Sequence, residues 1–325
     1  MEIKTLSPSF ALTGVIDTAT ILSYSECFAD AGKLFISLPF TTEHYQLLKP
    51  PCRILVEDLI FNVDKIQATS EQIRVYGSGI FSELKQFYIA SPEEQNGAPC
   101  DILYDFASRV SFEGISYAVY GIATKDERVH EGYEWCTDLC TIISQLCYDY
   151  DLGFRMAYSF DTRELGFHIF SVRDRATSEA STFTTICDGV GAFSKIESIY
   201  DVTNYKNYVE LVYLLRAYDR VDSVVYNRCA EGESIRGYCE HFAYPFLSNT
   251  PQAVCDARAR QIFKAHRKRR QFRATLNGAP QHRIGDLCYV KSEALGEMAY
   301  ALLTEREISV INGARQEVLI LEVQE

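Results

Sequence analysis

The stretch of sequence that decides the fold reads Lys33-Leu34-Phe35-Ile36-Ser37-Leu38-Pro39. Its alternation places Leu34, Ile36 and Leu38 on one face, which is the period of a half-buried β-strand. Pro39 ends the pattern, because proline has no backbone N–H to give to a neighbouring strand. We therefore predict a strand over residues 33–39.

Short strands are predicted on both sides of it. Their patterns occur at residues 12–16, 21–28, 52–57, 60–66 and 72–77. The last two resemble a hairpin around residues 68–71, and residues 42–48 form one or two helical turns before Pro50-Pro51. Several short strands without a long helix between them are typical of an antiparallel barrel or sandwich.

Helical patterns enter in the middle of the chain. Residues 91–99 are polar and contain two prolines, and we interpret them as a linker between domains. Helices are predicted at Cys100–Val110 and at Trp135–Tyr150, the second from apolar residues at helical spacing. A hairpin of residues 153–158 and 165–171 follows. These elements indicate a small α+β domain.

Strand patterns resume from Ile196. Residues 205–213 form a strand rich in Tyr and Val, and Pro251 favours the start of a helix that ends at Ala265. Further strands are predicted at 271–276, 284–290, 299–311 and 316–323. Residues 283–323 repeat the order found in residues 52–77, namely strand, turn, longer strand, polar turn, strand.

Length and composition indicate a folded protein of two or three domains. The chain has 325 residues, of which 47% are hydrophobic and 23% are charged. Its 21 Tyr and 19 Phe favour strands and contribute strongly to interfaces.

The eleven cysteines are interpreted as core residues of a protein made in a reducing cytoplasm. The first residues form no apolar signal segment, and no run of about 18 apolar residues predicts a membrane span. Cys136, Cys140, Ile143 and Cys147 share one helical face, which favours a core stripe. A zinc site is disfavoured because Cys136 and Cys140 lack a clear second pair.

The charge pattern disfavours nucleic acid as the general partner. The net charge is −12, and phosphate repels an acidic protein. The basic stretch Arg258–Arg273 contains eight Arg and Lys residues, so a phosphate-binding face stays open. A solvated helix end or a contact with carboxylates of another domain or subunit accounts for it better, since only Phe263 and Phe272 are near for base stacking.

No sequence motif argues for catalysis. Tyr76-Gly77-Ser78-Gly79 lacks the rest of a phosphate-binding loop, and no nucleophile elbow occurs. Glu305 and Glu307 share a strand face and are interpreted as surface residues, and Cys255 and His266 do not share a helical face. We therefore expect a protein that is not an enzyme and has no cofactor or metal.

Three stretches of the chain resemble the tail hub proteins of tailed phages and phage-like contractile particles. The first joins Gly14-Val15-Ile16-Asp17 to Ala31–Pro39, and the second joins Val63-Asp64-Lys65-Ile66 to Ile73–Gly77 and Leu84. The third joins Ile284–Val290 to Thr304–Ile308. Each motif is short, but the three stand in the family's order and span nearly the whole chain.

This resemblance implies a fold that is mainly β, with two small antiparallel β-barrels of the tail-hub type and an α+β insertion. The first barrel is expected at residues 1–90, the helix-containing middle domain at 91–195, and the second barrel at 196–325 with an inserted helix at 249–270. Many relatives carry a further C-terminal lysozyme or peptidase domain. Because this sequence stops at Glu325, we expect a hub without its own cell-wall hydrolase.

The resemblance also implies a function in assembly. Three copies are expected to form a ring at the distal end of the tail tube, where they contact the tube or distal tail protein, the tape-measure protein and a central spike or fibre protein. The protein is expected to be made in the bacterial cytoplasm and assembled into a virion tail or extracellular particle, with no specific nucleic acid partner. Candidate interface residues are Tyr205, Tyr208, Tyr213, Arg267, Arg269 and Arg270.

Other functions stay open at this point. One is a sixfold ring component of the distal tail or baseplate. Less favoured are a cell-wall hydrolase and a nucleic-acid binder that uses Arg258–Arg273.

Overall fold

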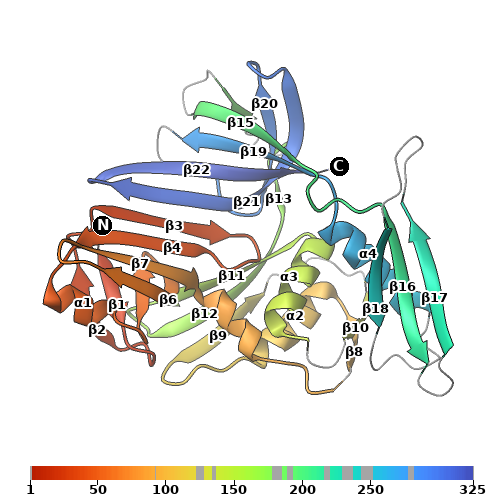
Figure 1. Cartoon of the computed structure of the whole chain (residues 1–325), viewed down its shortest axis with the longest axis horizontal. Helices are drawn as coiled ribbons and strands as arrows, with labels where there is room; N and C mark the ends of the chain where they lie inside the picture. Colours follow the sequence, from red (N-terminus) through yellow and green to blue (C-terminus); the bar gives the residue numbers. More distant parts are fainter. Residues whose placement is uncertain are drawn as a thin grey trace. The chain divides into compact units, whose positions relative to one another are not determined.

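A computed structural model describes residues 2–91, 93–121, 128–133, 137–177, 185–188, 193–215, 220–228, 237–242, 252–276 and 282–324 (Figure 1). The chain divides into two compact units. We call Met1–Ser198 with Gln271–Glu325 the body, and Ile199–Arg270 the insert unit.

The first part of the body is a curved antiparallel sheet, the N-terminal barrel. Its strands are hydrogen-bonded in the order β3-β4-β7-β6-β5-β1-β2. The elements are β1 (Ile3–Leu6), β2 (Leu12–Ile16), β3 (Ile21–Cys27), β4 (Lys33–Pro39), α1 (Thr42–Leu48), β5 (Arg53–Val56), β6 (Leu59–Ala68), β7 (Gln72–Gly79) and the 3-10 helix η1 (Ile80–Gln86).

Strand β4 confirms the prediction for residues 33–39. Leu34, Ile36 and Leu38 are buried in a core that β1, β3, β5, β6 and β7 also line. Burial of such apolar side chains is the main free-energy gain of folding, so the alternation of β4 sets the direction in which the sheet faces its core.

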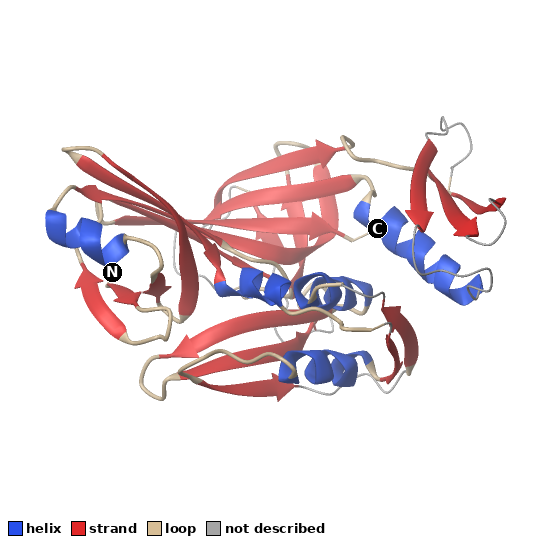
Figure 2. Cartoon of the chain, turned by 60° about the horizontal axis from the view of Figure 1, so that its bottom comes forward, coloured by secondary structure: helices blue, strands red, loops and turns tan. Residues whose placement is uncertain are grey.

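The middle of the body contains two helices and two small sheets; Figure 2 shows helices in blue and strands in red. Helix α2 contacts β9 and β12, and α3 contacts β11. The strand order is β11-β12-β9 in one sheet and β10-β8 in the other. The elements are β8 (Glu93–Gly97), α2 (Pro99–Ser108), β9 (Ser116–Gly121), β10 (Val129–Tyr133), α3 (Leu139–Asp149), β11 (Leu152–Ser159) and β12 (Glu164–Ser171).

This region confirms both predicted helices and corrects the predicted linker. Residues 93–97 form β8, which pairs with β10 antiparallel from Glu93↔Tyr133 to Gly97↔Val129. Glu93 also accepts a hydrogen bond from the Arg109 guanidinium at 2.7 Å. The polar composition is thus that of an exposed two-stranded ribbon.

The last part of the body, the C-terminal barrel, has the strand order β15-β19-β22-β21-β20, and β13 and β14 pair with β20. Its strands are β13 (Arg173–Asp174), β14 (Thr185–Cys187), β15 (Phe193–Asp201), β19 (Arg269–Leu276), β20 (Asp286–Ser292), β21 (Glu297–Ile311) and β22 (Ala314–Val323). Arg173 and Asp174 pair in parallel with Asp286 and Leu287.

The two barrels repeat one five-stranded module. In chain order, β3, β4, β5, β6 and β7 correspond to β15, β19, β20, β21 and β22, and both sets are hydrogen-bonded in the same spatial order. The longest strand of each set contains a bulge, between Val63 and Lys65 in β6 and between Leu303 and Glu305 in β21. The echo between residues 52–77 and 283–323 is therefore a structural repeat.

The barrels are joined through one strand. Residues 297–302 of β21 pair with β20, whereas residues 305–311 pair with β3 from Glu305↔Cys27 to Ile311↔Ile21. Ile308 of β21 is fully buried in the core of the N-terminal barrel. Residues from both ends of the chain thus share one sheet (Figure 1). The predicted division into domains at 1–90 and 196–325 contains no such connection between the two barrels.

The insert unit combines a small sheet with a helix. Its sheet has the order β17-β16-β18, and α4 contributes Ala259, Ile262 and Phe263 to a core with Val209 and Leu211. Its elements are β16 (Tyr208–Leu215), β17 (Arg220–Asn227), β18 (Gly237–Phe242) and α4 (Gln252–Ala265). The helix predicted at 249–270 ends too late, because Arg269 and Arg270 already belong to β19; residues 249–251 lie outside the described residues.

Candidate assembly surfaces

The joint between the barrels contains a shared carboxylate. Glu26 on β3 is 8% exposed, and its side chain lies 2.6 Å from Arg155 Nε of β11 and 2.8 Å from a terminal guanidinium nitrogen of Arg306 on β21. Arg155 also donates to both carboxylate oxygens of Asp58 at 2.9 Å. Charged groups from both barrels and the middle region therefore meet around Glu26.

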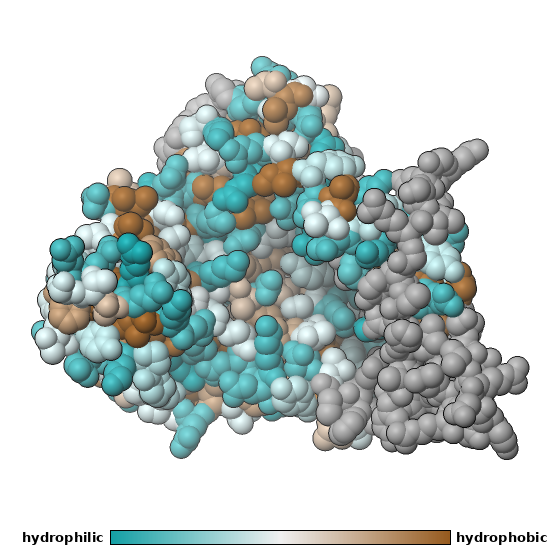
Figure 3. Space-filling model, viewed as in Figure 1, coloured by the Kyte–Doolittle hydropathy of each residue, from teal (hydrophilic) through white to brown (hydrophobic). Residues whose placement is uncertain are grey.

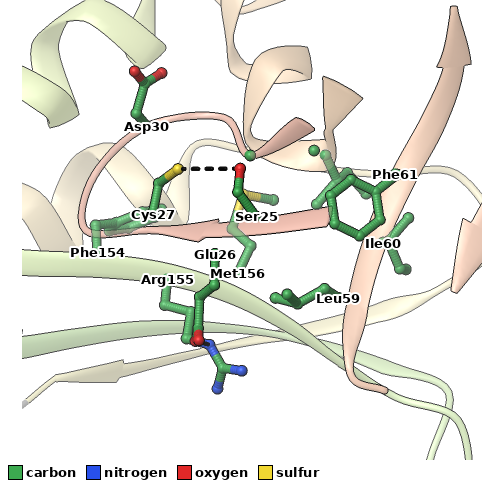
Figure 4. A pocket seen from close by; sticks show the side chains of 13 residues that line it. Ser25, Glu26, Cys27, Asp30, Leu59, Ile60, Phe61, Phe154, Arg155 and Met156 are labelled. Atoms are coloured by element: carbon green, nitrogen blue, oxygen red, sulfur yellow. Dashed lines mark hydrogen bonds and ion pairs between the residues drawn. The ribbon is translucent and has the colours of Figure 1, made fainter. Parts of the chain in front are cut away.

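A cavity of about 40 Å³ lies beside this joint (Figure 4). Glu26, Cys27, Asp30, Phe61 and Arg155 line it, together with other residues of β6, β7 and β11. Burial raises the pKa of the Cys27 thiol to about 12, and the Glu305 carboxylate adds to the shift. The thiol therefore stays protonated at neutral pH and is a poor nucleophile.

A larger groove, of about 340 Å³, opens between β5, β6, β7 and η1. The Arg53 guanidinium in its wall lies 4.0 Å from the centre of the Phe10 ring and 3.1 Å from a Glu83 oxygen. Burial lowers the pKa of Arg53. The Ser78 hydroxyl donates to Asp64 at 3.2 Å and lies 3.1 Å from the Ser82 hydroxyl. The groove is polar and suits hydrogen-bonding groups of a partner chain.

Some strands have an open edge among the residues that the structure describes. Among the described residues, β15 pairs only with β19, and β2 pairs only with β1. Strand β6 pairs with β5 over residues 59–62, so in the described part of the chain residues 64–68 have β7 on one side and no strand on the other. An unpaired strand edge presents N–H and C=O groups that another chain can pair with.

Apolar side chains also gather on the outer face of the β20–β21 hairpin. The rings of Tyr289 and Tyr300 are 5.4 Å apart, and Met298 is 61% exposed. Figure 3 shows apolar residues at the top of the view, over this hairpin. Exposed apolar groups in such a patch favour contact with another protein.

The candidate interface residues from the sequence all lie in or next to the insert unit. Tyr205 lies beneath the Lys268 ammonium, 4.8 Å from its ring centre, so the structure brings it against the basic segment. Tyr208 is half-buried at the start of β16, while Tyr213 is in β16 with its side chain outside the described residues. Arg267 follows α4, and Arg269 and Arg270 begin β19. Their function as interface residues stays a prediction.

The cysteines and glutamates considered above as candidates for metal binding or catalysis are buried or half-buried in helices and strands. Cys140 and Cys147 are buried in α3, and burial raises the pKa of both thiols; Cys136 lies outside the described residues. Glu305 and Glu307 are half-buried, and burial raises the pKa of Glu305. In the described part of the chain, no group of three or more His, Cys, Asp or Glu is placed to hold a metal ion.

Comparison with known proteins identifies the fold. No protein-family model and no curated protein matches the chain. Three solved structures match over nearly its whole length: prophage tail protein gp18 of Listeria monocytogenes EGD-e (13% identity, TM-score 0.54, 99% of this chain and 94% of that one), a tail protein of Neisseria meningitidis MC58 (11%, 0.58, 98% and 95%) and the 43 kDa tail protein of prophage MuSo2 of Shewanella oneidensis (13%, 0.56, 99% and 98%).

The fold is that of phage tail proteins. The predicted class, mainly β with an α+β insertion, is confirmed. No helix among the described residues is both long and apolar enough to cross a membrane.

Sequence reasoning missed the joint at the centre of this tail-protein fold. Glu26, Arg155 and Arg306 each interrupt a predicted strand with a charge, and such interruptions at inward positions are a signal of paired buried charges. The pairing itself depends on β3 meeting β21 across more than 270 residues of sequence. No local pattern reports such a contact.

Proposed function

We propose that this protein is a structural tail hub. In this proposal, three copies form a ring at the distal end of a phage or phage-like tail tube and join the tube to a central spike or fibre complex. The repeat of one five-stranded module within the chain is the observation that carries the proposal.

The repeat supports a ring with two kinds of symmetry. Each chain offers two modules of the same strand order, so three chains supply six similar positions. Such a ring matches a sixfold tube on one face and a threefold spike on the other. Closed cyclic symmetry is the usual solution for head-to-tail contacts.

The open edges indicate how the ring closes. Inside the chain, the part of β21 after its bulge pairs with β3. The corresponding elements are residues 64–68 of β6, after the same bulge, and β15, and both have an open edge among the described residues. We infer that β6 of one copy pairs with β15 of the next, which repeats the internal joint between copies.

Other parts of the proposal follow from a structural function. The hub acts by geometry and not by catalysis, with the tube or distal tail protein and the tape-measure protein as further partners. The net charge of −12 supports a lumen that repels DNA during its passage. The protein is made in the bacterial cytoplasm and is then incorporated into the tail or particle.

The experiment measures the mass of the purified protein by light scattering and images the same sample by negative stain. We expect threefold rings with three times the chain mass of 36.9 kDa, each with six similar lobes. In a variant with Gln67→Pro, which breaks the open part of β6, the rings should be lost. The control Thr13→Pro changes a residue of the open strand β2 that has no partner in the β1–β2 register; it removes one side-chain hydrogen bond to Thr5 and should leave the rings intact.

Other outcomes separate the competing functions. A sixfold ring favours a distal-tail or baseplate component instead. If both proline variants lose the rings while their circular dichroism is unchanged, the loss is not specific to β6. That result would contradict the proposed β6–β15 contact between copies. A monomer that cleaves cell-wall polysaccharide overturns the proposal.

A further inference from the structure

The charge of the chain is divided unequally between its two units. Residues 199–270 contain 12 Lys and Arg against 8 Asp and Glu, a net charge of +4, so the body carries −16. The insert unit is thus a basic module in an acidic protein. Opposite charges of this size affect which surfaces two copies can bring together.

The cations gather at one end of the insert unit. Arg260 and Lys264 lie one turn apart on α4, and Arg267 follows just after the helix. Arg260 and Arg269 are exposed, whereas Ala259, on the face toward the sheet, is buried. The Asp256 carboxylate accepts a hydrogen bond from Tyr226 at 2.8 Å and so faces its own sheet. We call Arg260, Lys264, Arg267 and Arg269 the basic end.

The insert unit also stands at a special place in the repeat. It is the connection between β15 and β19, which corresponds to the short turn between β3 and β4 in the other module. The two modules therefore differ at this turn: residues 202–268 connect β15 to β19, whereas only residues 28–32 connect β3 to β4. In a ring of three chains, and hence six modules, the insert unit would be present on every second module, that is, three times.

We propose that the basic end of the insert unit docks on the acidic body of a second copy of this chain. This inference rests on the proposed ring and names a contact that holds it. Surfaces of opposite charge on different parts of one chain can meet head to tail, which is the contact that a closed ring needs. The contact also reduces the repulsion between bodies that each carry −16.

The acidic charge of the whole chain favours a protein partner over a nucleic acid. A DNA strand would have to approach a chain whose net charge is −12, which repels phosphate. Each further copy of the chain supplies one acidic body for one basic end.

The test measures mass by light scattering at about 0.05 M and about 0.5 M NaCl, across which the screening length falls severalfold. We expect the concentration for half-assembly of the wild type to rise about tenfold or more at the higher salt. The variant Arg260→Glu with Arg269→Glu should need a similar rise already at low salt. The control Lys49→Glu with Lys85→Glu reverses two exposed cations of the body, so its net charge is the same. It should assemble like the wild type.

The outcomes separate this inference from the ring itself. Rings that form equally in both double variants and at both salt concentrations overturn the docking and leave the proposed hub intact. A wild type that is monomeric at every concentration and salt overturns both. Fluorescence anisotropy with a short labelled DNA duplex checks the alternative partner. The basic end is assigned to nucleic acid instead if two results hold. The mass of the wild type does not change with salt, and the double variant Arg260→Glu with Arg269→Glu loses DNA binding while the control variant keeps it.

Discussion

At the scale of single residues, Glu26 is the point where three parts of the body meet. Replacing it with alanine leaves the Arg155 and Arg306 guanidinium groups, 29% and 16% exposed, without their shared carboxylate. Breaking a buried ion pair from one side is strongly destabilising. We expect Glu26→Ala to lower the free energy of unfolding by about 3 kcal/mol, measured by urea denaturation and circular dichroism.

A matched exposed pair provides the control. Lys195 and Glu197 form an ion pair at the surface, where water screens the charges. Glu197→Ala should leave the urea midpoint unchanged. Equal midpoints for the two variants would mean that Glu26 contributes no more than a surface charge.

His282 gives the body a dependence on pH. Its ring is 5% exposed, and among the described residues neither ring nitrogen has a hydrogen-bond partner. Burial lowers its pKa below 6.5, and Arg175 and Arg173 act in the same direction against Asp286. Below pH 6.5 the unfolded chain therefore binds a proton at His282 more readily than the folded chain does. The free energy of unfolding falls as the pH falls below 6.5.

The variant His282→Leu removes this proton and keeps an apolar contact with Phe193. Between pH 6.5 and the lowered pKa, the wild type should lose up to about 1.4 kcal/mol per pH unit more than the variant. Urea denaturation at a series of pH values measures the difference. Parallel curves for the two proteins would show that His282 does not titrate in this range.

The sequence alone predicts the strand β4 but not the contacts of Glu26, His282 and Tyr205. The alternation of Leu34, Ile36 and Leu38 was sufficient to predict β4, because burial on one face is a local pattern. The partners of Glu26 and the two arginines near His282 were not predictable, because they come from strands far away in sequence. Tyr205 is a candidate because it begins the predicted Tyr-rich strand 205–213, and its contact with Lys268 depends on how residues 204–206 meet the end of α4.

At the scale of elements, β21 belongs to both barrels. Ile308 on its second half is fully buried in the N-terminal core, whereas Ile311 on the same strand is 48% exposed. We expect Ile308→Ala to lower the free energy of unfolding by about 3 kcal/mol, the usual cost of a cavity in a core. Ile311→Ala should change it by under about 0.5 kcal/mol. A small effect of Ile308→Ala in urea denaturation would contradict the joint.

Element prediction succeeded where the pattern is strong and failed at weak boundaries. The order of strands in the repeat was visible in the sequence as an echo. Residues 93–97 were missed because a polar, exposed strand has no alternation to detect. The end of the helix predicted at Ala265 is confirmed, whereas the wider bounds 249–270 run into β19, because the basic residues after Ala265 suit a helix end and an exposed strand equally.

At the scale of the whole molecule, the insert unit is an addition to a connection between neighbouring strands. The Lys206 N–H donates to the His266 carbonyl at 2.9 Å, so the chain enters and leaves the unit at adjacent points. The buried apolar core of the unit among its described residues is small: Val209, Leu211, Ala259, Ile262 and Phe263. Body and insert unit should therefore differ in their ability to fold alone.

We expect a chain in which residues 207–265 are replaced by a short Asn-Gly turn to fold, because both barrel cores remain in the body. Its far-UV circular dichroism should be that of a β-rich protein with a cooperative thermal transition. The fragment 199–270 alone should lack such a transition, since its few buried residues offset little conformational entropy. If the shortened chain aggregates while the fragment folds, the insert unit is part of the folding core. If the shortened chain folds but its mass no longer depends on salt, the basic charge added at this one turn controls assembly without contributing to the fold.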